Sequence, residues 1–262
     1  MLICPVCGEP LEREGSSFQC RNRHSFDIAR ENYVNLLRTS KKADLMGDDK
    51  ISARSRRDFL NRGYYSILKD ALCAIFEGRS GTLLDICCGE GYYTSAVAEN
   101  KNLEVYGFDL SREMVRLAAK RGNVNCFVAN MASIPVRDAS FDYAMHLFAP
   151  FNEAEFSRVL KPGGKLYSVV PGANHLLGLK ELVYENPYLN DEKLPETTAL
   201  ALVSKSKVCG QITLKNQADI EAVFRMTPYY FHTSAQDREK ITSVETLDTP
   251  VEFVIGEYKK LS

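Results

Sequence analysis

The sequence has no stretch of about 18 consecutive apolar residues, the length that a membrane-spanning helix needs, so we expect no membrane span. It has no excess of one charge, because 33 Lys and Arg oppose 34 Asp and Glu. Bulk charge therefore favours no partner, and any basic surface must be local. No basic start precedes a long apolar run, so we expect no signal peptide and a cytoplasmic, reducing location. In such a location cysteines more often bind metal or react than form disulfides.

The composition is that of an ordinary globular protein, with 45% apolar and 26% charged residues in a chain of 262. Residues 1–37 are too few to bury a stable core of their own, so this unit needs a cross-link such as a bound metal. We expect a polar linker over residues 38–60 and a larger domain over residues 61–262. An amphipathic helix is predicted from Asp58 to Phe76, with a break near Gly63.

Short apolar runs alternate with helical patterns through the middle of the chain, which predicts an α/β fold with a mostly parallel sheet covered by helices on both faces. The spacing predicts strands over residues 81–88, 103–111, 124–130, 140–150 and 165–172, and helices over residues 92–100, 112–122 and 152–160. A further helix is predicted over residues 217–225, and a last strand over residues 250–260.

Four potential metal ligands lie near the N-terminus: Cys4, Cys7, Cys20 and His24. A gap of two residues lets a tight turn direct both sulfurs of the first pair to one point. The stretch "EREGSSF" is a good hairpin turn that brings the second pair back. Thiolates and imidazole suit tetrahedral zinc, and four protein ligands leave no open position for catalysis. The spacing therefore predicts a structural zinc site that supplies folding energy to this unit.

Basic residues flank these ligands, since Lys and Arg outnumber Asp and Glu by eleven to six over residues 21–62. A small zinc unit with basic residues beside it is a plausible nucleic-acid-binding surface. A solvated charged face explains the same pattern equally well, and both interpretations stay open.

The stretch "LLDICCGEGYYT", residues 83–94, predicts a strand, a glycine turn and a helix start. The dinucleotide fingerprint G-x-G-x-x-G is broken here, and only Gly89-Glu90-Gly91 remains of it. Asp85, just before the turn, would repel a pyrophosphate but could hold an ammonium group. This favours S-adenosylmethionine over NAD as the cofactor.

Two further polar residues follow neighbouring strands. Asp109 can accept hydrogen bonds from both ribose hydroxyls of a nucleoside, and Asn130 is placed to touch the adenine edge. The structural alternatives are a simple turn at Gly89 and a helix cap at Asp109. Ser111 fits the capping role at least as well as Asp109. The combination in this strand context favours a nucleotide-like cofactor.

Several stretches together resemble one family. "LLDICCGEGYYT", "GFDLS" and "RVLKPGGKLYSVVPG" resemble class I S-adenosylmethionine-dependent methyltransferases, which have a Rossmann-like fold. "SRRDFLNRGYY", "FAPFNEAEFSRVLKPGG" and "PGANHLLGLKELVYENPYL", with the Cys/His unit, resemble the RlmA/RrmA family of 23S rRNA (guanine-N1)-methyltransferases. The resemblance implies transfer of a methyl group from S-adenosylmethionine to guanine N1 in a hairpin of 23S rRNA. It also implies a homodimer.

The resemblance assigns residues as well. It implies zinc ligation by the four residues named above, and cofactor contacts at Tyr65, Gly89, Glu90 and His175. Cys87 departs from the family, which usually has glycine there, and we expect its backbone to avoid positive φ.

Two other interpretations stay open: a methyltransferase for another RNA or a small molecule, and a zinc-containing RNA-binding protein without catalysis. A NAD-dependent oxidoreductase ranks behind them because the third glycine is missing.

No catalytic residue is identified from the sequence. His146 could serve as a base, but an inward-pointing strand residue is an equal interpretation. Aromatic residues that could stack on a base, or simply pack in the core, are Phe148, Phe151, Tyr229 and Tyr230.

Overall fold

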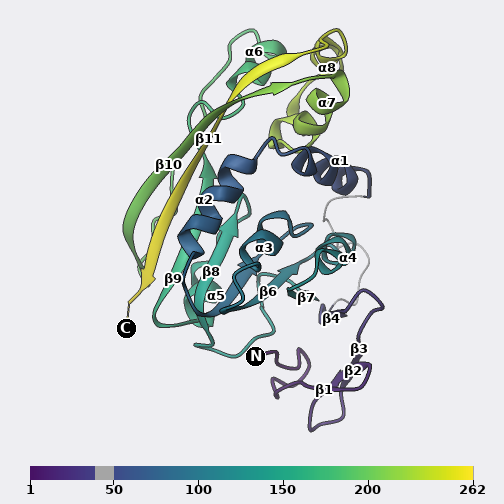
Figure 1. The fold of residues 1–262 in the computed structure, drawn as a ribbon, viewed down its shortest axis with the longest axis vertical. Helices are drawn as coiled ribbons and strands as arrows, with labels where there is room; N and C mark the ends of the chain where they lie inside the picture. The colour runs from purple at the N-terminus through teal and green to yellow at the C-terminus, as the bar shows by residue number, and fades with distance from the viewer. Residues whose placement is uncertain (39–49, 262) are drawn as a thin grey trace.

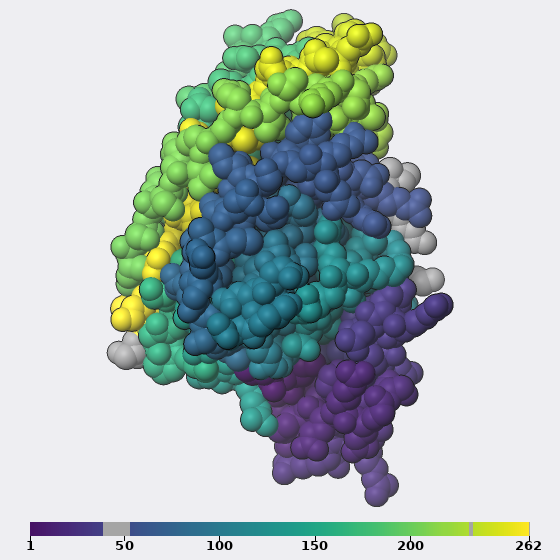
Figure 2. Space-filling model, in the orientation of Figure 1, coloured from purple at the N-terminus to yellow at the C-terminus, as the bar shows by residue number. Residues whose placement is uncertain are grey.

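The computed structural model describes residues 1–38 and 50–261. The chain begins with a small antiparallel sheet of three strands, β1 (Glu12–Glu14), β2 (Ser17–Gln19) and β3 (Ser25–Asp27). The expected hairpin lies between β1 and β2, where Glu14 pairs with Ser17. This N-terminal part protrudes from one end of the molecule (Figure 1; purple in Figure 2).

The main sheet has eight strands in the order β10-β11-β9-β8-β5-β6-β7-β4. The six strands from β9 to β4 run parallel, whereas β11 and β10 pair antiparallel at the other edge. Their bounds are β4 (Tyr33–Asn35), β5 (Gly81–Ile86), β6 (Leu103–Asp109), β7 (Asn125–Val128), β8 (Phe141–Leu147), β9 (Leu160–Pro171), β10 (Leu200–Leu214) and β11 (Leu247–Lys260). The predicted α/β class with a mostly parallel sheet is therefore confirmed.

Helices cover both faces of this sheet (Figure 1). Successive residues of a strand point to opposite faces. Leu83 of β5 accordingly packs in one apolar cluster with Leu68 and Leu72, and Leu84 packs in a second cluster with Phe156. The described helices are α1 (Lys50–Asn61), α2 (Ser66–Phe76), α3 (Tyr92–Val97), α4 (Arg112–Arg121), α5 (Glu153–Val159), α6 (Leu177–Val183), α7 (Gln217–Arg225), α8 (Ala235–Thr242) and the 3₁₀ turn η2 (Pro228–His232).

The predicted break near Gly63 is present, because α1 ends at Asn61 and Gly63 has φ 82°. However, α1 begins at Lys50, within the range expected as a linker. Ala53, Phe59 and Leu60 are buried. This polar stretch therefore has an apolar face, and burial of that face stabilises the helix. Residues 39–49, the rest of the predicted linker, lie outside the described residues.

The N-terminal part is built into the larger sheet. Strand β4 pairs with β7, so residues 33–35 extend the edge of the parallel sheet. Leu2 forms a bridge with Val136, and Ile3 donates its backbone N–H to Pro135. The sequence pattern gave no sign of this added strand. In the described part of the chain, no helix has the length and apolarity to cross a membrane.

Candidate metal centre and cofactor site

The four predicted metal ligands converge. The ligand atoms of Cys4, Cys7, Cys20 and His24 all lie within 4.8 Å of one another. The sulfurs of Cys7 and Cys20 are 3.7 Å apart, and Nδ1 of His24 lies 3.5 Å from the sulfurs of Cys4 and Cys20. A tetrahedron of Zn–S bonds about 2.3 Å long has edges of about 3.8 Å. The donor set and its spacing therefore fit zinc.

Two tight turns produce this convergence. Gly8 has φ 75° and donates its N–H to the carbonyl of Cys4 at 2.8 Å. The backbone N–H of Arg23 reaches the carbonyl of Cys20 at 2.8 Å. A hydrogen bond from the backbone of Glu9 lowers the pKa of Cys7 to about 6. The thiolate is the form that binds a metal, so this turn favours the ligand state.

The glycine turn connects β5 to α3 at the carboxyl end of the parallel sheet. Gly89 has φ 56° and Gly91 has φ 79°, a region that favours glycine. A Cβ placed on Gly89 would meet no atom within 4 Å, so space remains above the turn. In open parallel sheets, ligands bind at this edge.

Cys87 lies in the same turn and has φ 61°. The expectation that its backbone avoids positive φ is therefore wrong. The chain must reverse between a buried strand and the turn, and it takes the left-handed conformation even without glycine. For an L-residue this costs about 1–2 kcal/mol.

We predict that Cys87→Gly raises the free energy of unfolding by about 0.5–1 kcal/mol, because the relief of strain exceeds the added entropy of the unfolded chain. Urea unfolding of the two proteins measures the difference. Cys88→Gly is the matched control, since Cys88 is not among the described residues with positive φ and its sulfur fills the space that a Cβ on Gly107 would enter, 3.2 Å away. That variant should lose stability, and a loss for Cys87→Gly as well would contradict the strain argument.

Two carboxylates lie below the turn. Asp85 is 3% exposed and accepts a hydrogen bond from the Thr94 hydroxyl, and burial raises its pKa to about 7. Asp109 accepts hydrogen bonds from the backbone N–H groups of Gly89 at 3.0 Å and Ser111 at 2.8 Å. Asp109 thus ties the end of β6 to the glycine turn.

Ser111 caps α4 by accepting from the Met114 N–H, as its position predicted. Asn130 is exposed two residues beyond β7, and its Oδ1 accepts the Ala132 N–H at 2.9 Å.

Glu90 is 2% exposed and pairs with Arg121 of α4. Nε of Arg121 donates to Oε2 of Glu90 at 2.7 Å and to its backbone carbonyl at 3.1 Å. The second carboxylate oxygen, Oε1, is buried and has no hydrogen-bond partner among the described residues. Such an atom normally finds a partner, so it is free to accept a hydrogen bond from a ligand.

Tyr93 has a second buried orphan atom, because its hydroxyl has no hydrogen-bond partner among the described residues. Burial raises its pKa well above the usual range, with further contributions from Tyr65, Tyr92 and Glu90, while Arg56 lowers it. An orphan donor and an orphan acceptor beside the glycine turn fit the amino and carboxylate groups of the methionine part of S-adenosylmethionine. Tyr93 was missed from the sequence, because an aromatic residue after a turn reads equally well as core.

Tyr65 and His175 are 110 residues apart in the sequence, yet they lie in contact. The Tyr65 hydroxyl is 3.1 Å from Nε2 of His175. Nδ1 of His175 accepts the backbone N–H of Glu252 at 3.2 Å, so the proton of the neutral ring lies on Nε2 and is donated to Tyr65. Burial and the charge of Lys180 lower the pKa of His175 to about 4, and the ring is therefore neutral at pH 7.

The segment that carries His175 is held by Asn190. Its side-chain amide donates to the carbonyls of Gly172 and His175, both at 3.0 Å. Lys180 of α6 is 1% exposed and donates to Oδ1 of Asn190 at 2.7 Å and to the carbonyl of Tyr188 at 2.9 Å. This network explains why Lys180 and Asn190 occur in the stretch "PGANHLLGLKELVYENPYLN".

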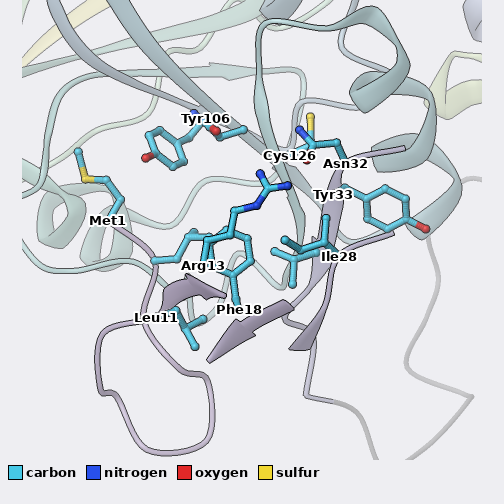
Figure 3. Close-up of a pocket in the computed structure, with 12 residues that line it drawn as sticks. Met1, Leu11, Arg13, Phe18, Ile28, Asn32, Tyr33, Tyr106 and Cys126 are labelled. Atoms are coloured by element: carbon cyan, nitrogen blue, oxygen red, sulfur yellow. The ribbon is translucent and has the colours of Figure 1, made fainter. Parts of the chain in front are cut away.

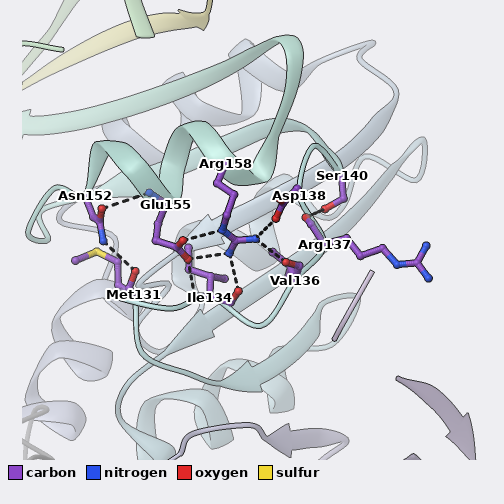
Figure 4. A network of polar contacts seen from close by, with 9 residues as sticks. All are labelled: Met131, Ile134, Val136, Arg137, Asp138, Ser140, Asn152, Glu155 and Arg158. Atoms are coloured by element: carbon purple, nitrogen blue, oxygen red, sulfur yellow. Dashed lines mark hydrogen bonds and ion pairs between the residues drawn. The ribbon is translucent and has the colours of Figure 1, made fainter. Parts of the chain in front are cut away.

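A second network lies after β7 (Figure 4). Arg158 of α5 donates to both carboxylate oxygens of Glu155 and to the carbonyls of Ile134 and Val136. Glu155 accepts the backbone N–H of Ile134 at 2.7 Å. The same segment is bonded to residues 1–3, so Arg158 fixes the surface on which the zinc unit sits.

His146 is buried and fully bonded. Its Nε2 lies 3.0 Å from the carbonyl of Pro150, and its Nδ1 lies 3.2 Å from the Ser168 hydroxyl. Burial lowers its pKa to about 4. The structural interpretation of His146 therefore holds.

Of the four candidate stacking residues, Phe148 is 43% exposed, directly after β8. Phe151 packs on His146 and Phe156, and Tyr229 is 9% exposed. Tyr230 packs on Phe224, with the Arg238 guanidinium 4.5 Å from its ring centre.

The strand order, the glycine turn and the acids at the carboxyl ends of the strands define a class I S-adenosylmethionine-dependent methyltransferase. A family model described as "RlmA, N-terminal" matches residues 2–44, and one described as "Methyltransferase domain" matches residues 83–164. The chain belongs to the RlmA family of 23S rRNA (guanine-N1)-methyltransferases. S-adenosylmethionine is the cofactor of this class, and zinc is the metal that suits the N-terminal cluster.

Three relatives bear on this membership. YxjB of Bacillus subtilis (strain 168), provisionally named a 23S rRNA (guanine-N(1)-)-methyltransferase, is 30% identical over 97% of this chain and 95% of its own. The 23S rRNA (guanine(748)-N(1))-methyltransferase of Streptomyces fradiae is 34% identical over 68% of this chain and 66% of its own. A demethylmenaquinone methyltransferase of Geobacillus sp. (strain WCH70) is 33% identical over only 38% of this chain and 50% of its own.

Proposed function

We propose that this chain transfers the methyl group of S-adenosylmethionine to N1 of a guanine in a hairpin of 23S rRNA. The observation that supports this most is similarity to YxjB over 97% of the chain, zinc unit included. The relative with a small-molecule name matches 38% of the chain. In a methyltransferase for a small molecule, the zinc unit would have no RNA to bind and would only cover the active site.

We propose Tyr65, Asp85, Gly89, Glu90, Gly91, Asp109, Asn130 and His175 as the cofactor-binding residues, and Tyr93 with them. Glu90 and Tyr93 would bind the methionine part through their orphan atoms. Asp109 would accept from the ribose, and Asn130 would touch the adenine edge.

Tyr93→Phe should weaken S-adenosylmethionine binding about tenfold, because it removes one hydrogen bond worth roughly 1–1.5 kcal/mol. The same change should leave the melting temperature of the cofactor-free protein unchanged or raise it, since the hydroxyl has no partner to lose. Equilibrium dialysis and calorimetry measure the two effects.

Tyr167→Phe is the matched control. Tyr167 is also a buried tyrosine, but it lies on β9 against Phe76 and Arg79. Tyr167→Phe should leave the affinity for S-adenosylmethionine unchanged. Equal affinity of wild type and Tyr93→Phe would show that Tyr93 does not touch the cofactor.

We propose Cys4, Cys7, Cys20 and His24 as the zinc ligands, within a zinc-binding unit of residues 1–37 that contacts RNA. Residues 38–60 would connect it to a methyltransferase domain of residues 61–262. Arg23 is exposed beside the metal cluster and suits a phosphate contact, whereas the exposed Arg21 pairs with Glu9.

The reaction proposed is an in-line displacement at the methyl carbon, so proximity and alignment supply much of the acceleration. Guanine N1 carries a proton that must leave before or during attack. His146 is too buried and too fully bonded to take it, and we assign no general base. Phe148, exposed at the carboxyl edge of the sheet, could stack on a base that has left its helix.

Transfer of labelled methyl groups tests the proposal. Wild-type protein should label unmodified large-subunit rRNA, and digestion should yield N1-methylguanosine. Labelling of a demethylated quinone but not of RNA would favour a small-molecule enzyme. RNA binding without transfer to any acceptor would favour a zinc-containing RNA-binding protein without catalysis.

We further propose a homodimer in the cytoplasm, where ribosomal RNA is found. Exposed Leu202 and Val203 on the outer strand β10 supply apolar surface that suits a contact between copies. Light scattering should give about twice the 29.5 kDa of one chain, whereas 29.5 kDa would exclude the dimer.

A further inference from the structure

A pocket lies in the seam between the N-terminal part and the main sheet, and we call it the seam pocket (Figure 3). Its volume is about 230 Å³, and residues of β1, β2, β4, β6 and β7 contribute to it. It lies beside Asn125 at the start of β7, whereas the glycine turn lies at the carboxyl end of the sheet. The seam pocket is therefore separate from the proposed cofactor site.

The lining divides into an apolar floor and a polar rim. Leu2, Leu11 and Val34 are buried in the floor. Arg13, Asn32 and Asn125 line the same pocket and are exposed. An apolar surface with a few convergent polar groups is the usual build of a ligand site.

Arg13 is the charged side chain of this lining. Figure 3 shows it pointing from β1 into the space between Tyr106 and Tyr33. It has no hydrogen bond or ion pair with any residue that the structure describes, and the described lining includes no Asp or Glu. Arg13 thus brings a positive charge to the pocket, while the carboxylate of Glu104 accepts the hydroxyl of the lining residue Tyr106 at 2.7 Å.

Arg13 also lies opposite Phe18 across the β1–β2 hairpin, so the guanidinium and the ring share one face. Guanidinium planes and aromatic rings are the groups on which proteins stack unpaired bases. Asn125 uses its amide N–H on the carbonyl of Val105, at 3.3 Å, and leaves its oxygen available, while Asn32 has no side-chain partner among the described residues. Amides hydrogen-bond well to base edges.

We propose that the seam pocket binds one unpaired nucleobase of the RNA substrate, with Arg13 stacked on the base and Asn32 and Asn125 bonded to its edge. The volume is below the roughly 300 Å³ at which sites for drug-sized ligands begin, and suits a single base. The base is not the one methylated, since it lies at the opposite end of β7. This inference rests on the proposed function, because it takes RNA as the substrate.

Arg13→Lys tests the proposal, since it keeps the charge and removes the planar group. The probes are an RNA hairpin with an unpaired loop and a blunt duplex of the same stem, with binding read by fluorescence anisotropy across a salt series. The variant should bind the hairpin about tenfold more weakly, as expected from loss of one stacked base. Its affinity for the duplex and the slope of affinity against salt should stay unchanged, because the charge is kept.

Arg30→Lys is the control, because Arg30 is exposed on the same unit and does not line the pocket. It should bind both RNAs as wild type does. Unchanged zinc content and cofactor affinity establish that both variants fold.

Wild-type affinity of Arg13→Lys for the hairpin would overturn the proposal. Equal losses on hairpin and duplex would overturn it too, since they indicate a phosphate contact. These outcomes are separable from failure of the proposed function, in which wild type would transfer no methyl group to RNA, whatever Arg13→Lys binds.

Discussion

Removal of zinc by a chelator should lower methyl transfer to RNA by at least about 100-fold. Structural zinc supplies roughly 10–16 kcal/mol of folding energy to small units, and the buried apolar residues of this part, such as Leu2 and Val34, belong to the core of the main sheet and do not hold the metal turns. The loss should spread to the segment around Val136, because Leu2 and Ile3 are bonded to it. Hydrogen exchange should show loss of protection in both places, while the strands β5, β6 and β8 stay protected.

Cys20→Ser should reproduce the effect of the chelator, with zinc content measured by atomic emission. Cys209→Ser is the matched control, because Cys209 is exposed on β10, away from the metal cluster. It should retain zinc and activity. Full RNA methylation by Cys20→Ser, or by metal-free protein, would contradict the role given to this unit.

Gly91→Ala should abolish measurable binding of S-adenosylmethionine and lower the free energy of unfolding by about 3 kcal/mol. The conformation at φ 79° costs an L-residue about 1–2 kcal/mol. In addition, the new Cβ would lie 2.8 Å from Cβ and 2.9 Å from Cα of Ala118, so α4 must move away from the turn. Such overpacking adds roughly 1–3 kcal/mol.

Gly78→Ala separates the two causes. Gly78 has φ 68°, but a Cβ there would meet no atom within 4 Å. We expect a loss of only about 1–2 kcal/mol and unchanged cofactor affinity. Urea unfolding and equilibrium dialysis measure both variants, and similar losses in the two would show that contact with Ala118 is unimportant.

The parallel sheet was predictable because its strands are buried on both faces and read as short apolar runs. Strands β5, β6 and β8 were predicted to within a few residues for this reason. Helix α1 begins at Lys50, whereas the helix was predicted to begin at Asp58. The many charged residues of this stretch obscure the pattern of the few apolar residues that are buried. Strand β9 begins at Leu160, ahead of the strand predicted over residues 165–172, and its register against β8 shifts between Phe141 and Tyr143.

The metal site was predictable from local spacing alone, since two tight turns determine its geometry. The pairing of Tyr65 with His175 depends on tertiary structure, and only the resemblance to a family pointed to both residues. The orphan hydroxyl of Tyr93 and the seam pocket have no local signal, because each depends on which neighbours are absent after folding. At Cys87 the local rule gave the wrong answer: a residue other than glycine prefers negative φ, but the geometry of the turn imposes a φ of 61°.

Methylation of guanine N1 in rRNA can be read by primer extension, because a methyl group at this atom blocks base pairing and stops reverse transcriptase. Unmodified large-subunit rRNA is incubated with the protein and S-adenosylmethionine, and the stops are mapped. We expect one new stop, at a guanine in a hairpin loop, that requires both cofactor and zinc-loaded protein. An unchanged pattern of stops, with protein that binds S-adenosylmethionine and holds zinc, would contradict it.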